Sequence, residues 1–582
     1  IANCSGFYGD RHAAAREMVE GGPIDFLTGD YLAELTMLIL WKNRLREGGV
    51  SYAKGFLRQL EEVLGTCVDR GIKVVTNAGG LDPAGMAGAV RELATRLGLG
   101  LSVAHVEGDD LMPLLESLQG EGEQLRHLDS GVAFAQTGRQ AITANAYLGA
   151  FGIVECLSAG ADIVVCPRVT DASLVVGPAA WRFGWTRSDL DQLAGAVVAG
   201  HILECGTQAT GGNYSFFQEV PGLEHPGFPL AEIRADGSSV ITKHPGTGGL
   251  VSVGTVTAQL LYEIGGPGYL NPDVEARFDT IELKQDGPDR VEVSHVKGFP
   301  PPPTTKVAIN ALGGFRNSVT FVLCGLDIEE KAALAESALE AAIGGRDAVE
   351  SFSSRLIRTD KEDAATNAEA CAELVITVKD QDQKKVGRSF TGAAIELALA
   401  NYPGLFATSP PSDATGFGIC WPTLVPNEVI HHEAVLPDGT RMTIPSRSGG
   451  LANLHSFTVE TVSDAATTET RREPLGTFYG ARSGDKAGNA NVGVWARERS
   501  HYSWLRDCLT VEKMRELLPE AADLPIERYE LWNLRAINFV IVGLLEEGVA
   551  ASTRPDPQAK SLGEYLRSRL IDVPSEWLAH PQ

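Results

Sequence analysis

Two short apolar stretches, each followed at once by polar residues, decide the fold class of this chain. They are IKVVTNAGG over 72–80 and ADIVVCPRVTD over 161–171. A helical pattern from Pro83 to Leu97 follows the first of them. Strands that alternate with helices pair in parallel, and their helices cover the faces of the sheet. The pattern therefore predicts an α/β fold whose mostly parallel sheet is flanked by helices.

The same alternation extends over the first 205 residues. Further strands are expected over 25–31 and 101–106, and further helices over 33–46 and 52–70. The carboxyl ends of parallel strands meet at one edge of a sheet, and ligands bind at that edge in open α/β folds. The polar loops after these strands are therefore the expected ligand site.

Composition changes along the 582 residues predict four regions. Residues 1–205 form the α/β region. Glycine and proline punctuate β-rich segments over 206–345, and strands alternate with a helix again over 346–462. A polar linker over 463–472 leads to a small α+β unit over 473–582.

The overall charge and the cysteines limit the function classes. The formal net charge is −25, with 75 acidic against 50 basic side chains, so the chain repels nucleic acid and anionic membrane surfaces. No apolar run reaches the ~20 residues that a membrane helix needs. The nine cysteines are odd in number and never spaced as CxxC, which favours free thiols in a reducing, cytoplasmic compartment. The first residues resemble the inside of a strand, so we expect native residues before Ile1.

The first candidate motif is SGFYGDR over 5–11. Its glycines let a ligand approach the backbone, and Ser5 and Asp10 are candidate substrate-binding residues. Arg11 is a candidate clamp for a carboxylate or phosphate. The alternative is a tight turn in which Asp10 caps a helix.

The second motif is TGDYLAE over 28–34. Asp30 and Glu34 are four residues apart, so they share a helix face if the helix begins by Asp30. Two close carboxylates raise the pKa of one of them, as an acid–base step requires, and they also suit a divalent cation. The alternative is an N-capping Asp followed by a first-turn Glu.

Polar loops that follow the expected strands form a third group. Asn77 and Asn145 are candidate substrate-binding residues, and Arg168 and Asp171 are the strongest candidates for catalysis. Each residue taken alone could belong to a turn or a cap. Their recurrence after successive strands is the informative feature, because a parallel sheet brings such ends together.

Two glycine-bounded segments follow, HILECGTQATGGN over 201–213 and KHPGTGG over 243–249. In the first, Glu204 is a candidate acid–base group and Thr207 a candidate substrate contact. Cys205 would need a base and a lowered pKa to act as a nucleophile, so an ordinary buried thiol is favoured. The second segment suits either a backbone cradle for an anion or a plain loop.

The C-terminal region carries RSGDKAGNAN over 482–491 after an expected strand. This alternation of small and charged residues is more typical of a ligand loop than of a surface turn, which makes Arg482, Asp485 and Lys486 candidate substrate-binding residues. No segment matches a nucleotide-binding fingerprint, so we expect no cofactor.

Several of these motifs occur together, in order, in a known family. GFYGDR, NAYLGA, GADIVVCPRVTDASL, GHILECGTQATGG and ITKHPGTGGLV together resemble the acyclic terpene utilisation protein A (AtuA-like) family, and ARSGDKAGNANVGV resembles its C-terminal ferredoxin-like domain. The resemblance implies a ferredoxin-like α+β domain at the C-terminus. It also implies a role in the catabolism of branched acyclic terpenoid acids through CoA thioesters, among relatives that look like subunits or fusions of carboxylic-acid-processing lyases. It implies no residue roles.

A site rich in acids, arginines and amides favours a cofactor-independent lyase of the hydratase or dehydratase type. Its substrate would be a branched or hydroxylated carboxylic acid or its CoA thioester, in acyclic terpenoid or secondary-metabolite metabolism. Arg11, Arg168 or Lys486 would hold the carboxylate or phosphate. The proton would be moved by a carboxyl group, for which the candidates are Asp30, Glu34 and Glu204.

Two alternatives remain open at this stage. One is a non-catalytic subunit that binds an acyl ligand or serves as a scaffold in a catabolic complex. The other is a lyase that depends on magnesium or manganese, with oxygen ligands from Asp30, Glu34, Asp109 or Glu204. A homo-oligomer is expected on general grounds.

Overall fold

The structure, a computed structural model, describes residues 1–446 and 469–579. The chain divides into two compact units. The first combines residues 1–310, 420–549 and 556–582, and the second combines 311–419 with 550–555. The four regions expected from the sequence stay a prediction. Residues 447–462 of the third region and 463–468 of the expected linker lie outside the described residues.

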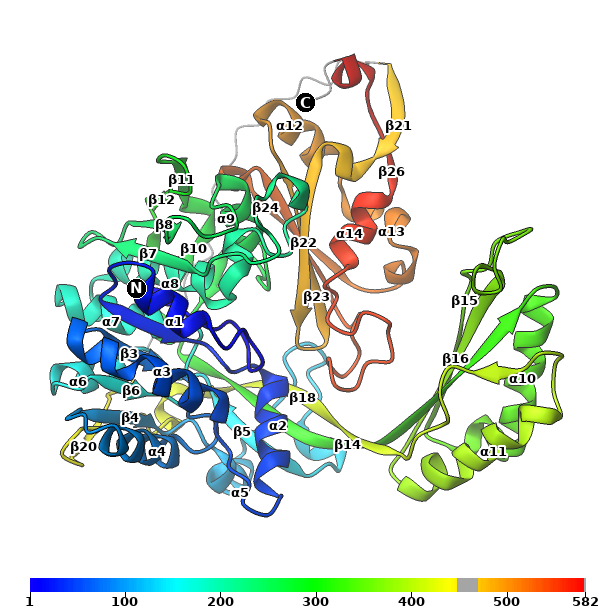
Figure 1. Cartoon of the computed structure of the whole chain (residues 1–582), viewed down its shortest axis with the longest axis horizontal. Coiled ribbons are helices and arrows are strands. Elements are labelled where there is room, and N and C mark those ends of the chain that lie inside the picture. The colour runs from blue at the N-terminus through cyan, green and yellow to red at the C-terminus, as the bar shows by residue number, and fades with distance from the viewer. Residues whose placement is uncertain (447–468, 580–582) are drawn as a thin grey trace. The chain divides into compact units, whose positions relative to one another are not determined.

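An eleven-stranded sheet forms the framework of the first unit (Figure 1). Its central strands pair in parallel in the order β1-β2-β3-β6-β4. Their bounds are Ala2–Asn3 for β1, Phe26–Gly29 for β2, Lys73–Thr76 for β3, Ile163–Val165 for β6 and Val103–Glu107 for β4. The strands expected over 25–31, 72–76, 101–106 and 161–166 therefore exist and lie side by side.

The prediction of a mostly parallel sheet needs correction, because most strand pairings are antiparallel. β7 (Pro229–Ile233), β8 (Ser239–Lys243), β12 (Val291–Ser294) and β11 (Glu282–Gln285) extend the sheet on one side. β19 (Glu433–Val435) and β20 (Arg441–Thr443) extend it on the other. Strands joined by short turns must run antiparallel, and three such hairpins flank the parallel centre.

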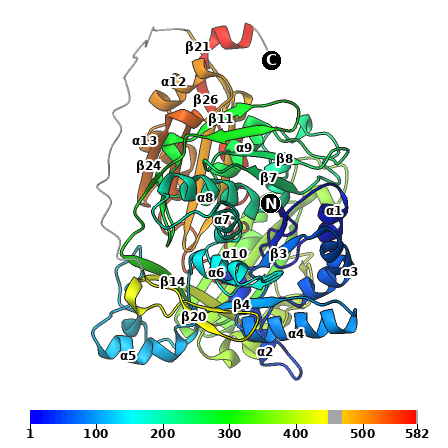
Figure 2. The same cartoon turned by 90° about the vertical axis from the view of Figure 1, so that its left-hand side faces the viewer.

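Helices cover both faces of the parallel centre. α1 (Ala14–Glu20), α3 (Lys54–Arg70) and α4 (Pro83–Arg96) bury Met18, Phe56, Leu60 and Val90 in one core with strand residues such as Val74. α6 (Phe151–Ser158), α7 (Ser173–Phe183) and α8 (Leu190–Glu204) pack side by side (Figure 2). The helix expected over 52–70 is confirmed: α3 ends at Arg70, and its C-cap Gly71 has φ +68°.

The C-terminal part of the first unit is an α+β domain of the ferredoxin-like type. Its antiparallel sheet has the order β22-β23-β25-β24, with bounds Tyr479–Lys486, Asn489–Ala496, Ala536–Ile541 and Ile526–Leu531. α12 (Arg499–Cys508), α13 (Val511–Leu517) and α14 (Leu562–Ser568) share a core with this sheet, and β21 (Thr470–Pro474) pairs with β26 (Leu570–Pro574).

The segment 482–491, expected as a ligand loop, is instead a β-hairpin. Arg482 pairs with Gly493, and Lys486 pairs with Asn489 across a turn of two residues. The candidate side chains are therefore held on rigid strands.

The second unit has its own sheet and core. β16 (Cys371–Asp380) lies between β15 (Ser351–Ile357) and β14 (Thr304–Cys324), and β14 also pairs with β17 (Phe406–Ala407) and β18 (Thr415–Pro426). α10 (Ile328–Ala342) and α11 (Phe390–Glu396) contribute Leu339 and Phe390 to its core. Only residues 304–310 of β14 belong to the first unit.

Candidate active site

Arg168 and Asp171, in the loop after β6, form the centre of the site. The Arg168 Nη1 atom donates to the Asp171 Oδ1 atom at 2.5 Å and to the Val169 carbonyl oxygen at 3.2 Å. The guanidinium lies 4.2 Å from the centre of the Tyr147 ring. Arg168 is buried, whereas 27% of the Asp171 side chain remains exposed. The pair is therefore held rigidly on its arginine side and reached by solvent on its carboxylate side.

Glu34 is bound by two side chains from distant parts of the chain. The Tyr147 hydroxyl donates to the Glu34 Oε1 atom, and the Lys306 Nζ atom donates to the same oxygen at 3.2 Å. Burial by itself raises the pKa of Glu34, but Lys306 and Arg168, together with the Tyr147 hydroxyl, lower it far below its usual value. Glu34 is therefore an ionised carboxylate that organises two other side chains.

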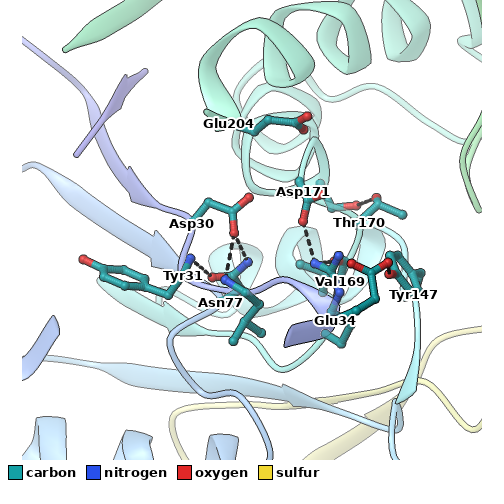
Figure 3. Close-up of polar contacts among 12 residues, drawn as sticks. Asp30, Tyr31, Glu34, Asn77, Tyr147, Val169, Thr170, Asp171 and Glu204 are labelled. Atoms are coloured by element: carbon teal, nitrogen blue, oxygen red, sulfur yellow. Dashed lines mark hydrogen bonds and ion pairs between the residues drawn. The ribbon is translucent and has the colours of Figure 1, made fainter. Parts of the chain in front are cut away.

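Asp30 and Glu34 do not share a helix face. The helix α2 (Glu34–Arg44) begins only at Glu34, and Ala33 before it is extended. Asp30 follows the end of β2 instead, and its Oδ1 atom accepts a hydrogen bond of 2.6 Å from the Asn77 side chain. The expected i, i+4 pair is therefore replaced by an Asp30–Asn77 pair across neighbouring strand ends (Figure 3).

The pKa of the buried Asp30 carboxyl is raised. Burial is the main cause, and the nearby Asp171 adds to it, against the lowering effects of Arg168 and Asn77. Asn77 also accepts a hydrogen bond of 2.8 Å from the Tyr31 backbone N–H. Asp30 is thus a carboxyl group whose protonated form is favoured in a site that also holds the ionised Glu34.

Glu204, the last residue of α8, is a second acid of this kind. Only 8% of the residue is exposed, and its Oε2 atom has no hydrogen-bond partner. Its Oε1 atom lies 3.0 Å from the His201 Nδ1 atom. Burial, followed by Asp171 and Glu263, raises the pKa of Glu204. Burial and Glu204 also raise the pKa of the Cys205 thiol, which disfavours the thiolate that a nucleophilic role would need.

The hairpin β22–β23 brings charged residues from the C-terminal domain to this site. The Arg482 guanidinium donates to the Gln208 Oε1 atom and lies 4.3 Å from the centre of the Tyr262 ring. The Lys486 Nζ atom donates to the Glu263 carbonyl oxygen at 3.3 Å. Both contacts join this domain to loops of the α/β part of the same unit.

Electrostatic interactions link these hairpin residues to the strand-end residues. Burial, then Glu263 and Glu34, raise the pKa of Asp485 to about 8. Burial and the Lys306 ammonium lower the pKa of Lys486. The site therefore contains two lysines that influence each other, surrounded by carboxyl groups.

Three predicted residues near the N-terminus hold a turn together. The Ser5 hydroxyl donates to the Phe7 carbonyl oxygen at 3.0 Å. The Asp10 carboxylate accepts from the backbone N–H groups of Gly6 and Arg11. The Arg11 guanidinium donates to Glu17 and to the Pro226 carbonyl oxygen. Asp10 therefore stabilises the turn, and the substrate-binding roles of Ser5, Asp10 and Arg11 stay predictions.

Other candidates also have internal partners. Asn145 is the second-last residue of β5 (Ala141–Ala146), which pairs with β14 and not with the parallel strands. Its side-chain amide donates to the Asp109 Oδ2 atom at 2.7 Å. The backbone oxygen of Thr207 accepts from the Thr210 hydroxyl. In the segment 243–249, Lys243 pairs with Asp289 at 3.1 Å, as in a plain loop.

Sequence reasoning missed Lys306, Glu263 and the role of Tyr147. Tyr147 is two residues from Asn145, which was the candidate that the sequence indicated in this segment. Lys306 follows a proline-rich stretch and is 272 residues from Glu34 along the chain, so no local pattern indicates their contact. Within 1–446 and 469–579, no three His, Cys, Asp or Glu side chains come together in a way that could hold a metal ion.

Comparisons with known proteins place these features in a family. Residues 1–436 match the acyclic terpene utilisation family protein AtuA, and residues 474–572 match the AtuA ferredoxin-like domain. Neither a curated protein nor a solved structure matches the chain. Among the described residues, no helix is long and apolar enough to cross a membrane.

Proposed function

This chain belongs to the acyclic terpene utilisation family AtuA, and we propose that it is a lyase of the hydratase or dehydratase type. Its substrate is a branched or hydroxylated carboxylic acid or the CoA thioester of one, in acyclic terpenoid or secondary-metabolite metabolism. The observation that carries the proposal is that two carboxyl groups in different surroundings share one site: burial raises the pKa of Glu204, while Asp171 beside it is ion-paired with Arg168.

Loss of water next to a carbonyl group needs a base and an acid. Asp171, held by Arg168 and partly open to solvent, is the base that removes the proton from the α-carbon. Glu204, with one carboxyl oxygen free of hydrogen bonds, is the acid that protonates the departing β-hydroxyl. The C–O bond breaks as the double bond forms, water leaves, and each carboxyl exchanges one proton. Hydration is the reverse of these steps.

The negative charge that develops on the carbonyl oxygen needs cations and hydrogen-bond donors. Lys486 approaches from the hairpin, and the neighbouring Lys306 ammonium helps to lower its pKa. We assign the substrate carboxylate or thioester carbonyl to these two lysines. Glu34 has too low a pKa for a base, and its role is to hold Lys306 and Tyr147 in place.

The proposal is tested by incorporation of heavy oxygen. Purified protein is incubated in H₂¹⁸O with a panel of unsaturated terpenoid acids and their CoA thioesters, and the products are analysed by mass spectrometry. We expect label in a hydroxylated product, and a fall of about 100-fold or more in the rate for Glu204→Gln and for Asp171→Asn. Glu116→Gln, an exposed glutamate on α5 (Leu115–Gly120), is the matched control and should keep the rate.

Absence of label across the panel would overturn the lyase proposal. Calorimetric binding of the same compounds without turnover would then favour the alternative of an acyl-ligand-binding or scaffold subunit.

We also propose a cytoplasmic location and a homo-oligomeric state. Support for the location comes from the nine cysteines, all of which are free thiols. Fractionation of cells that express the full-length protein tests the location, and light scattering of the purified protein tests the oligomeric state.

A further inference from the structure

Two cysteines of the second unit lie opposite each other on neighbouring strands of its sheet. Cys324 is the last residue of β14, and Cys371 is the first residue of β16. The register of these antiparallel strands makes them direct partners. Both are half-buried, whereas Cys4, Cys67, Cys156 and Cys166 are buried.

The backbone hydrogen bonds next to this pair show which kind of position it occupies in the antiparallel ladder. The Gly325 backbone N–H donates to the Ala370 carbonyl oxygen at 3.1 Å, so residues 325 and 370 form a hydrogen-bonded pair. Such pairs alternate along an antiparallel ladder with non-hydrogen-bonded pairs, whose Cα atoms are closer, at about 4.5 Å. Cys324 and Cys371 therefore occupy a non-hydrogen-bonded position. Disulfides span Cα distances of about 4.4–6.8 Å, so this position can accommodate one without movement of the strands.

The two thiols also point toward one group. The Asn367 carbonyl oxygen lies 3.1 Å from the Cys371 Sγ atom and 3.9 Å from the Cys324 Sγ atom. The Asn367 side chain donates to the Cys324 Sγ atom at 3.3 Å. A shared acceptor places both sulfur atoms on the same side of the sheet, where they can meet.

We propose that Cys324 and Cys371 form a dithiol site that reacts with small-molecule disulfides and closes to an intramolecular disulfide. The thiolate of one cysteine attacks the small disulfide, forms a mixed disulfide and releases one small thiol. The thiolate of the other cysteine then attacks the protein sulfur of the mixed disulfide and releases the second small thiol. The protein loses two electrons and two protons, which reduce the small disulfide to two thiols.

The experiment uses the full-length protein and oxidised glutathione. After incubation, free thiols are alkylated and the protein is digested without reduction for mass spectrometry. We expect one peptide pair joined between Cys324 and Cys371, which separates on reduction. In Cys324→Ser and in Cys371→Ser we expect the remaining cysteine to carry glutathione instead. Cys508→Ser, which removes a half-buried cysteine of another domain, should leave the joined pair unchanged.

Two results would overturn the proposal. One is complete alkylation of both cysteines in the wild-type protein after oxidation. The other is stable glutathione on both cysteines with no joined peptide, because adjacent thiols displace it. A trivalent arsenical that needs two neighbouring thiols gives a test without any substitution: it should protect Cys324 and Cys371 together from alkylation, and failure to protect them would contradict the inferred geometry.

Discussion

Replacement of Asp109 by asparagine tests the electrostatics of the strand-end loops in a single measurement. Asp109 follows β4 and is 4% exposed. Its Oδ2 atom accepts hydrogen bonds from the Asn145 side chain at 2.7 Å and from the Arg168 backbone N–H at 3.3 Å. An asparagine oxygen can accept both bonds, so Asp109→Asn removes the titration while keeping the contacts.

The size of the expected change in the free energy of unfolding follows from the pKa of Asp109. Burial raises it from 3.8 to about 7, although the hydrogen bonds from Asn145 and Arg168 lower it. A carboxyl whose pKa is higher in the folded state contributes stability that is complete below its unfolded pKa and is lost as the pH rises toward the folded pKa. The difference between the folded and unfolded pKa values corresponds to about 4 kcal/mol in the free energy of unfolding. Of this stability, about 3 kcal/mol is lost between pH 5 and pH 8.

The assay is urea unfolding of wild type and Asp109→Asn at pH 5 and pH 8. The free energy of unfolding of the variant, relative to wild type, should rise by about 3 kcal/mol from pH 5 to pH 8. Other carboxyls with raised pKa values, such as Asp30, occur in both proteins and cancel. Glu116→Gln, at an exposed position of α5, is the control and should show no such rise. A variant that differs from wild type equally at both pH values would refute the reasoning.

Three further substitutions give independent tests. Lys306→Ala leaves the Glu34 carboxylate without its ammonium partner. It should lower the free energy of unfolding by about 1–2 kcal/mol, since both side chains are partly exposed. Glu34→Gln in the same chain should restore most of this loss, and no restoration would contradict the pairing. Gly6→Ala would place a Cβ atom 2.6 Å from the Cys205 carbonyl carbon and should cost about 1–3 kcal/mol, so an unchanged melting temperature would argue against this close approach. Ala487 has φ +56° in the hairpin turn, and Ala487→Gly should stabilise the protein by about 1 kcal/mol, which a urea midpoint equal to or below that of wild type would contradict.

Some features of the protein could be read from the sequence because they depend on neighbouring residues. The central strands β3 and β6 lie within the apolar stretches at 72–80 and 161–171, and α3 ends at Arg70 as expected. A strand or helix signal is a local period in hydrophobicity, and it needs no knowledge of the partner. The ordered motifs likewise identified the family and its ferredoxin-like domain.

Other features were decided only by the tertiary structure. One antiparallel flank of the large sheet begins where Ala2 pairs with Leu230, a partner that no local pattern indicates. Lys306 reaches Glu34 across 272 residues, and the hairpin residue Lys486 reaches Glu263 across 223. The period of hydrophobic residues indicates which face of a segment is buried. The direction of strand pairing and the pKa of a buried group depend instead on which distant residues pack beside it. The sequence alone therefore determined the elements and the family, and the folded chain decided which charges meet.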